Sequence, residues 1–352
     1  MNTDDTRDWL ADAGVILNAN ARKVTRRIRE KAEEIVPRTQ LYFSESLDDA
    51  RAYIQEMVER RTPTIVCGGG DGTIVSTINQ IRQVLEEKNQ AFKDAYDRMS
   101  FPNLAILRLG TGNAWGHLLE SAKGVEPLAH LRNGDRVRLT RFNLVRDHQD
   151  THFHFAGMGW DAKVLNDYQQ MKTRFENVPV LRQWMIGLQG YFSTIFLKSI
   201  PDVLFRKQAT IRVINEGEDV YSRVWGEEPV KLPVKYGETI YEGPTNAAGC
   251  ATTPYYGFKL RAFPFSQERE NFMNVRVMAA SVTECLTHLR QIWNGTWRSN
   301  NVHDFLAQKV RFEFQEDTPY QIGGDAAGYL DQATFSVSDL TVNMLDFSPV
   351  KG

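Results

Sequence analysis

The stretch TPTIVCGGGDGTIVST, residues 62–77, restricts the fold of this chain more than any other. An apolar run leads there through three glycines into a helix-like segment. Glycines at the end of a strand let the backbone come close to an anion, and the N-terminus of the following helix adds partial positive charge. The pattern therefore predicts a phosphate-binding turn, although Asp71 lies inside it and a lone carboxylate would repel phosphate.

The first third of the chain repeats this strand-and-helix pattern. Short buried strands that alternate with amphipathic helices are typical of a doubly wound α/β sheet with parallel strands. We expect strands at 14–18, 39–44, 64–67 and 104–109 and helices at 21–35, 47–60 and 73–87.

The pattern changes near residue 136, after which period-two segments dominate, as in antiparallel strands. Helical segments interrupt them at 161–199 and 281–293. Because 352 residues exceed one ordinary core, we predict an α/β nucleotide-binding domain (1–135) followed by a β-rich, antiparallel β-sandwich-like domain (136–352). Whether the last segment packs back on the first domain stays open.

Composition limits the class of protein. The formal net charge of −2 gives no basic field that would attract nucleic acid. Three widely spaced cysteines form neither a disulfide framework nor a metal-ligand set. Residues 1–14 lack the apolar segment of a secretory signal. We therefore expect a cytoplasmic protein.

Three turns follow predicted strands, at 18–23, 68–73 and 110–113. Ligands of open α/β sheets bind at the carboxyl ends of strands, so these turns can meet at one site. The central turn is not the dinucleotide fingerprint, because Thr73 stands where its third glycine would be. It is not a Walker A loop either, because no Gly-Lys-Ser/Thr follows.

Asp71 has two chemical roles that fit a phosphate-binding turn. It can hold Mg²⁺, which binds carboxylate and phosphate oxygens together. It can also accept the proton of an attacking hydroxyl. Both roles indicate phosphoryl transfer, and the alternative is that Asp71 only caps the helix expected to begin at Thr73.

Residues 69–79, GGDGTIVSTIN, resemble the glycine motif of the diacylglycerol kinase catalytic domain, which bacterial lipid kinases, sphingosine kinases and ceramide kinases share. Further segments resemble other motifs of this family in the same order, and they span nearly the whole chain. They are 16–23, 44–51, 109–115 and 321–330.

The resemblance implies an ATP site between the two domains, with Mg²⁺, and a lipid that enters the C-terminal domain. Asp71 and Asp325 would be catalytic and would bind the metal, and Asn79 would support the loop. The residues that would line the nucleotide are Asn18, Lys23, Ser44, Gly69, Gly70, Gly72, Thr73, Gly110, Thr111 and Asn113.

Departures from the family pattern refine the expectation. Bacterial diacylglycerol kinases have aspartates where this chain has Ala114 and Thr140, and sphingosine kinases resemble this chain in lacking both. We therefore expect a sphingoid base or ceramide as substrate, with diacylglycerol as the alternative. The family's Asp-Gly-Glu is here Gly323-Gly324-Asp325, which moves the general base to Asp71, although the choice between Asp71 and Asp325 stays open.

Residues 180–200 carry apolar side chains at helical spacing, followed by Arg206 and Lys207. They form either a core stripe or the rim of a lipid pocket in peripheral contact with a membrane. Trp160 and Asp161 could contact a headgroup or cap a helix. His152 and His154 alternate on a strand, but a third metal ligand at suitable spacing is not visible.

Two other functions remain as alternatives. NAD kinases share a Gly-Gly-Asp-Gly loop but have no counterpart of the GTGN segment. A lipid-binding protein that has lost catalysis would explain Ala114, Thr140 and Gly323 but not the retained Asp71 and its glycines.

Overall fold

The computed structural model describes residues 8–21, 23–90, 92, 98–134, 137–160, 162–163 and 208–349. The chain divides into two compact units. Unit 1 contains residues 1–142 and 340–352, and unit 2 contains residues 143–339. The expected helix at 161–199 and the apolar face at 180–200 lie outside the described residues, apart from 162–163.

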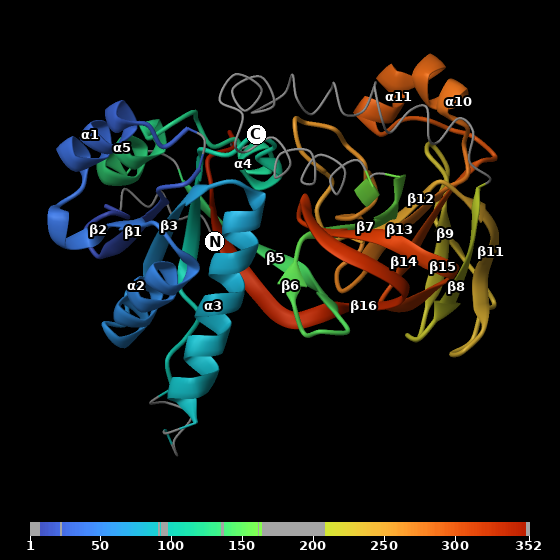
Figure 1. Cartoon of the computed structure of the whole chain (residues 1–352), viewed down its shortest axis with the longest axis horizontal. Coiled ribbons are helices and arrows are strands. Elements are labelled where there is room, and N and C mark those ends of the chain that lie inside the picture. The colour runs from blue at the N-terminus through green and yellow to red at the C-terminus, as the bar shows by residue number, and fades with distance from the viewer. Residues whose placement is uncertain are drawn as a thin grey trace, which may run out of the picture. The chain divides into compact units, whose positions relative to one another are not determined.

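Unit 1 is built on a parallel sheet in the order β4-β3-β1-β2 (Figure 1). The end of β16 extends this sheet, since Met344 pairs in parallel with Leu104 of β4. The predicted parallel sheet is thereby confirmed. Its strands are β1 (Ala13–Asn18), β2 (Leu41–Ser44), β3 (Thr64–Gly69) and β4 (Asn103–Arg108).

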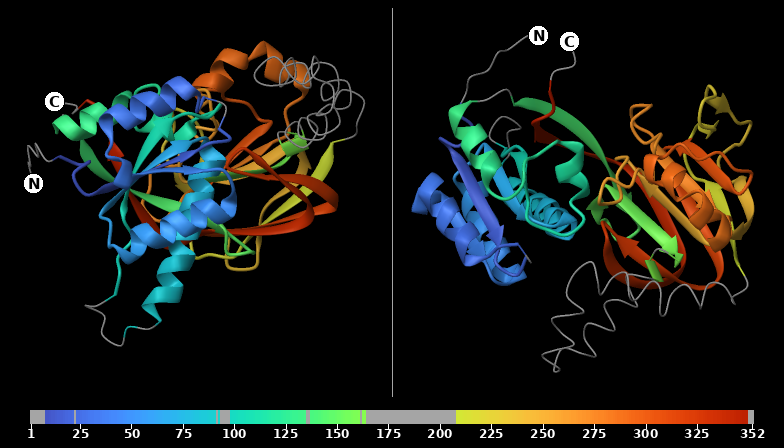
Figure 2. Two further views of the ribbon diagram at one scale, coloured as in Figure 1. Left: turned by 60° about the vertical axis from the view of Figure 1, so that its left-hand side comes forward. Right: turned by 90° about the horizontal axis from the view of Figure 1, so that it is seen from above.

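Helices cover both faces of the unit 1 sheet (Figure 2). Val15 and Val66 share one core cluster with Ala32 of α1 and Leu128 of α5. On the other face, Met57 of α2 packs so closely on Gly14 that an added Cβ would lie 2.1 Å from its sulfur. The helices are α1 (Arg26–Ile35), α2 (Leu47–Glu59), α3 (Asp71–Asn89), α4 (Ala114–Leu118) and α5 (Glu126–Asn133), with a 3₁₀ turn at Arg38–Gln40.

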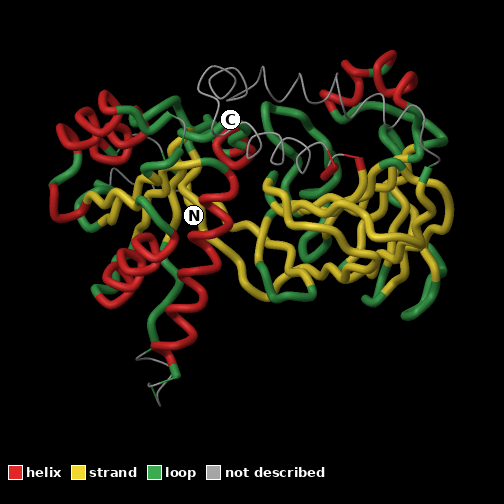
Figure 3. The backbone as a smooth tube through the Cα atoms, viewed as in Figure 1, coloured by secondary structure: helices red, strands yellow, loops and turns green. Residues whose placement is uncertain are grey.

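Strands dominate unit 2, and its described pairs are antiparallel (Figure 3). One run of strands has the order β10-β9-β14-β13-β12-β7-β15, and β8 joins β11 to β15. The strands are β5 (Arg138–Asp147), which begins in unit 1, β6 (His152–Phe153), β7 (Phe155–Gly159), β8 (Ala209–Asn215), β9 (Val220–Arg223), β10 (Val230–Lys231), β11 (Thr239–Thr245), β12 (Ala247–Ala251), β13 (Met273–Met278), β14 (Val302–Ala307), β15 (Lys309–Ile322) and β16 (Asp325–Asp346), which ends in unit 1.

Strand β15 belongs to both runs because its two ends have different partners: residues 310–314 pair with β8, and residues 320–322 pair with β7. Its pairing with β16 is irregular between Glu313 and Thr318 and between Pro319 and Gln321. Phe312 and Phe153 pack edge-on against Phe335 in the core of this unit.

Two short helices, α10 (Val282–Thr287) and α11 (Leu289–Asn294), connect β13 to β14. They account for the expected helical segment at 281–293. None of the described helices combines the length and the hydropathy that crossing a bilayer would need.

Candidate active site

The three turns of unit 1 meet at the carboxyl ends of its parallel strands. Asn18, at the end of β1, donates from Nδ2 to the Thr73 Oγ1 at 3.0 Å. The Ala19 N–H donates to the carbonyl oxygen of Ser44, at the end of β2, at 2.8 Å. Of the predicted nucleotide residues, Asn18, Ser44 and Thr73 therefore lie in one connected group.

The GTGN segment is closed by its own asparagine. Asn113 has a φ of 52°, and its side chain accepts from the Gly110 N–H at 3.0 Å and donates to the Gly110 carbonyl oxygen at 2.8 Å. The Leu109 N–H in turn donates to the carbonyl oxygen of Gly69 at 3.2 Å. Asn113 therefore shapes this loop, and the Leu109 N–H holds it against the glycine turn.

The glycines of the two loops differ in why they must be glycine. A Cβ added at Gly68 would lie 2.2 Å from the Leu17 side chain, and one added at Gly69 would lie 2.4 Å from the Thr73 side chain. A Cβ added at Gly110 would lie 2.2 Å from the Gly70 Cα. These three positions are fixed by packing.

Gly70 is the exception. A Cβ there would meet only the Gly110 Cα within 4 Å, at 3.4 Å, and its φ of −100° is open to any residue. Internal packing and backbone conformation therefore do not explain the glycine at position 70. The free space beside its Cα is what close approach of a ligand phosphate would require.

Asp71 is the first residue of α3 and is buried. Its Oδ1 accepts a hydrogen bond from the Trp115 N–H of α4 at 3.3 Å. The idea that Asp71 caps a helix beginning at Thr73 is wrong, because α3 begins two residues earlier with Gly70 as N-cap. Its carboxylate instead joins the glycine turn to α4. The motif did not reveal Trp115 as its partner, because the contact is made by a backbone N–H group.

The N-terminus of α3 points its first-turn N–H groups out of the helix. The first intrahelical hydrogen bond runs from the Ile74 N–H to the Gly70 carbonyl oxygen at 3.2 Å. Gly72 and Thr73 lie within that first turn. A helix of 19 residues adds partial positive charge at this end, so the turn suits an anion.

The remaining predicted residues of unit 1 lie at the rim of these loops. Lys23 and Thr111 are exposed. The backbone N–H of Lys23 donates to the Leu109 carbonyl oxygen at 3.3 Å, which places the first turn beside the GTGN segment. Asn79 donates from Nδ2 to the Val75 carbonyl oxygen at 2.8 Å, within α3 itself.

Asp325 belongs to unit 2, where it is exposed and begins β16. Gly323 and Gly324 form the two-residue connection from β15, with φ values of 57° and 87°, and Ile322 pairs with Asp325. Positive φ at both central residues is the geometry of a type I′ hairpin turn, which favours glycine. The turn thus explains the glycines that replace the family's first two motif residues.

The groups at this site suit the phosphates of ATP, and they supply part of what Mg²⁺ needs. The open position at Gly70 and the N-terminus of α3 suit phosphate. Within the described residues no group of three or more His, Cys, Asp or Glu side chains could hold a metal ion. Mg²⁺ beside a nucleotide commonly takes only one or two carboxylates, with phosphate and water completing its shell, and Asp71 can supply one.

The four further candidates are Trp160, Asp161, His152 and His154. Trp160 donates from its backbone N–H to the Asn246 carbonyl oxygen at 2.7 Å, and Asp161 is not described. His152 and His154 are both buried, and burial lowers the pKa of His154 to about 3.

Thr140 donates from Oγ1 to the Asp346 carboxylate at 3.2 Å, and Arg138 donates to the same oxygen at 2.7 Å. The position at which the family resemblance suggested a lost aspartate is therefore filled by a polar contact to the C-terminal segment.

Residues 12–142 match the family described as the diacylglycerol kinase catalytic domain. No curated protein matches the chain. Solved structures from Bacillus anthracis str. Sterne share the fold. Two, provisionally named diacylglycerol kinases, are 16% identical, with TM-scores of 0.60 and 0.58 and coverage of 98% of this chain and 97–98% of theirs. A third, named a diacylglycerol kinase, is 14% identical over 98% of both chains with a TM-score of 0.56.

The family match and the fold agree with the loops and Asp71. They support a lipid kinase, and kinases of this family use ATP. Residues 12–142 thus carry the match to the diacylglycerol kinase catalytic domain, and the solved structures share the fold of the chain.

Proposed function

We propose that this lipid kinase transfers the γ-phosphate of ATP to a lipid hydroxyl, with Asp71 as general base. Gly70 carries the proposal. Gly68, Gly69 and Gly110 are glycines because the protein packs against them, whereas a Cβ at Gly70, the residue before Asp71, would meet only the Gly110 Cα, at 3.4 Å. A position kept open for a ligand next to a buried carboxylate is the arrangement that phosphoryl transfer needs.

Each part of the loops has a task in this proposal. The first-turn N–H groups of α3 hold phosphate oxygens, and the Asn18–Thr73 hydrogen bond keeps that turn in place. ATP supplies the phosphoryl group, and Mg²⁺ when bound offsets the charge between phosphate and carboxylate. Ser44, Lys23 and Thr111 line the edge of the nucleotide site.

Asp71 accepts the proton that the lipid hydroxyl releases as its oxygen bonds to phosphorus. The Trp115 N–H fixes one carboxylate oxygen and so orients the group. Asp325 is proposed to hold the metal ion or an attached water, since it is exposed at the start of β16. In the alternative, Asp325 is the base.

The acceptor is proposed to be the primary hydroxyl of a sphingoid base or ceramide. Ala114 and Thr140 support this choice, because each departs from the diacylglycerol kinase pattern at a carboxylate position. Thr140 is moreover engaged with Asp346. A second candidate, diacylglycerol, is favoured by the family match and by the names of the structural neighbours.

Phosphate transfer from labelled ATP to diacylglycerol, ceramide and sphingosine in detergent micelles tests both the kinase activity and the identity of the lipid acceptor. The Asp71→Asn protein, purified in the same way, measures contaminating kinases. Transfer to ceramide or sphingosine in excess of diacylglycerol is expected. Preferred transfer to diacylglycerol would replace the acceptor and keep the kinase, and no transfer above the Asp71→Asn control would overturn the proposal.

A further inference from the structure

Two segments of unit 2 that are distant in sequence lie side by side. The loop from β12 to β13 contains Arg261, whose backbone N–H donates to the carbonyl oxygen of Trp293 in α11 at 2.9 Å. Gly295, just after α11, also packs closely here, since an added Cβ would lie 2.7 Å from the Arg261 carbonyl oxygen. The turn at 257–260 and helix α11 are therefore held together.

Helix α11 exposes large apolar side chains. Leu289 is 53% exposed and Trp293 is 40% exposed. Their spacing of four residues places them on one side of the helix. Exposed single apolar residues are common, but two on one helical side beside a second projecting element form a surface that needs an explanation.

The turn next to α11 is strained. Phe258 and Lys259 have φ values of 50° and 65°. Residues other than glycine, asparagine and aspartate are uncommon at such positive φ values. The turn is closed by hydrogen bonds from the Leu260 N–H to the Gly257 carbonyl oxygen and from the Tyr256 N–H to the Leu260 carbonyl oxygen, at 2.8 and 2.9 Å. Lys259 is exposed and Phe258 is half-buried at its tip. Strain of this kind persists where the surroundings enforce it, and it often marks a functional position.

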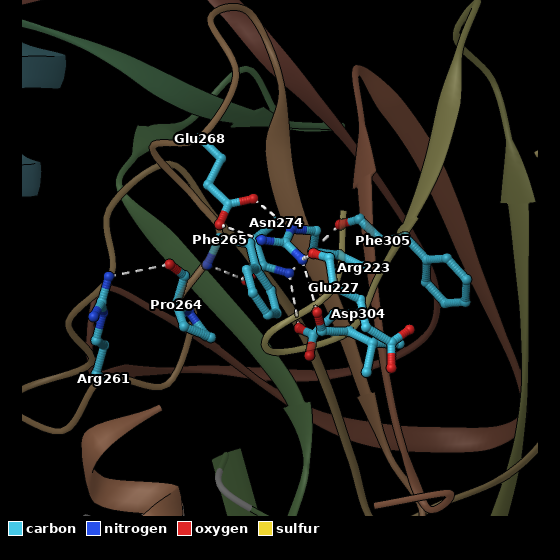
Figure 4. A network of polar contacts seen from close by, with 10 residues as sticks. Arg223, Glu227, Arg261, Pro264, Phe265, Glu268, Asn274, Asp304 and Phe305 are labelled. Carbon is cyan, nitrogen blue, oxygen red and sulfur yellow. Dashed lines mark hydrogen bonds and ion pairs between the residues drawn. The ribbon is translucent and has the colours of Figure 1, made fainter. Parts of the chain in front are cut away.

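A polar network anchors the far end of the same loop (Figure 4). The Asn274 Oδ1 accepts from the Phe265 N–H at 3.2 Å, and its Nδ2 donates to Asp304 at 2.9 Å. Arg276 binds the same carboxylate with two hydrogen bonds of 2.8 Å. The loop is thus fastened at Arg261 and at Phe265, and the strained turn at 257–260 comes directly before the first of these points.

The two segments that form this surface carry cations and no acidic residue of their own. Residues 252–266 and 285–301 contain no aspartate or glutamate, although the whole chain has a net charge of −2. Arg298 pairs with Glu227, and the Arg261 guanidinium donates to the Pro264 carbonyl oxygen at 3.3 Å. Lys259 and Arg290 make no ion pair with any described residue.

We propose that helix α11 and the 257–261 turn form a docking surface for an anionic lipid bilayer. Leu289 and Trp293 would enter the region between headgroups and acyl chains, where tryptophan is favoured, and Lys259 and Arg290 would bind lipid phosphates. The combination of exposed apolar side chains with two cations that make no ion pair with a described residue matches this occupant. The inference rests on the proposed function in that a kinase of membrane lipids must reach them.

Co-sedimentation with vesicles tests the docking surface without nucleotide. Vesicles of phosphatidylcholine alone are compared with vesicles that also contain phosphatidylserine. The chain should bind the anionic vesicles, and added salt should weaken that binding. The Lys259→Gln/Arg290→Gln protein should bind them roughly 25-fold more weakly, at roughly fivefold for each cation removed. The Leu289→Gln/Trp293→Gln protein should bind both kinds of vesicle more weakly.

The matched control is Lys235→Gln/Tyr236→Gln, which removes an exposed cation and an exposed aromatic residue from another turn of unit 2. It should bind like the unchanged protein. The inference would be overturned if the Lys259→Gln/Arg290→Gln protein bound anionic vesicles as tightly as the unchanged protein, or if the control variant lost as much binding as the docking variants. It would also be overturned if the unchanged protein bound no vesicles. Phosphate transfer in detergent micelles separates the two proposals, because it tests the kinase without a bilayer and the docking variants should retain it.

Discussion

The Asp71 carboxylate accepts a hydrogen bond from the backbone N–H of Trp115, 44 positions further along the chain, at 3.3 Å. This contact joins the first turn of α3 to the start of α4, and therefore joins the two glycine loops. A side chain that organises the loops and follows Gly70 directly in the chain can act in structure and in chemistry at once.

The two roles of Asp71 can be separated by Asp71→Asn. The asparagine oxygen can still accept from the Trp115 N–H, so folding should be preserved, but the neutral amide can neither take up a proton nor attract a metal ion. Loss of a general base typically lowers kcat by roughly 10²–10⁴-fold. Steady-state phosphate transfer measures the change, with thermal melting as the folding control.

Asp325→Asn is the matched comparison for the choice of base. If Asp325 only orients a metal ion or its water, this variant should retain more activity than Asp71→Asn. A folded Asp71→Asn enzyme with near-normal kcat, or an Asp325→Asn enzyme with the lower kcat of the two, would move the base to unit 2.

Gly70→Ala should lose nucleotide binding but keep its stability, whereas Gly110→Ala should lose stability. The alanine at 70 has room within the protein, so the variant should fold normally and lose Mg-ATP affinity, because its methyl group occupies the space for phosphate. The alanine at 110 would lie 2.2 Å from the Gly70 Cα, so that variant should be strongly destabilised. Calorimetric titration and thermal melting measure the two effects. Unchanged Mg-ATP binding by Gly70→Ala would contradict the phosphate site.

Much of unit 1 could be predicted from the sequence because each of its elements carries its own signal. The apolar runs of β1 and β3 and the capping box of Ser46 and Asp49 before α2 are local features. The start of α1 was less clear. The helix begins at Arg26, because the Thr25 side chain caps it by accepting from the Ile28 N–H, whereas composition alone placed the start at residue 21.

Unit 2 was harder to predict where tertiary packing decides the structure. Strand β12, Ala247–Ala251, has neither β-branched residues nor alternation, yet it lies between β7 and β13. Its small residues are required by close approach, since a Cβ on Gly249 would lie 2.5 Å from the Ala156 carbonyl oxygen. Likewise, no sequence pattern indicated the Thr140 to Asp346 contact, because the partners are 206 positions apart.

Asn113 should be the most costly asparagine to replace in the site. Asn113→Ala removes two side-chain hydrogen bonds, each worth about 0.5–1.5 kcal/mol, and leaves an alanine at a φ of 52°, which adds about 1–2 kcal/mol. The free energy of unfolding should fall by about 2–5 kcal/mol in total. Asn113→Gly is the matched variant, since it loses the same hydrogen bonds but tolerates positive φ. Urea unfolding should show a smaller loss for glycine, and equal losses would contradict the strain.

His154 should make the stability of the protein depend on pH below neutrality. The ring is buried edge-on to Phe155, and burial lowers its pKa to about 3 from an ordinary value of 6.5. Between these two values the unfolded chain binds a proton that the folded chain does not, so stability falls as the pH falls from 6.5 toward 3. The slope from this group is about 1.4 kcal/mol for each pH unit, and its contribution is fully present above pH 6.5. His154→Gln cannot take up the proton, so urea unfolding of this variant should show a shallower decline over the same range. Equal slopes for both proteins would show that His154 keeps its ordinary pKa in the folded state.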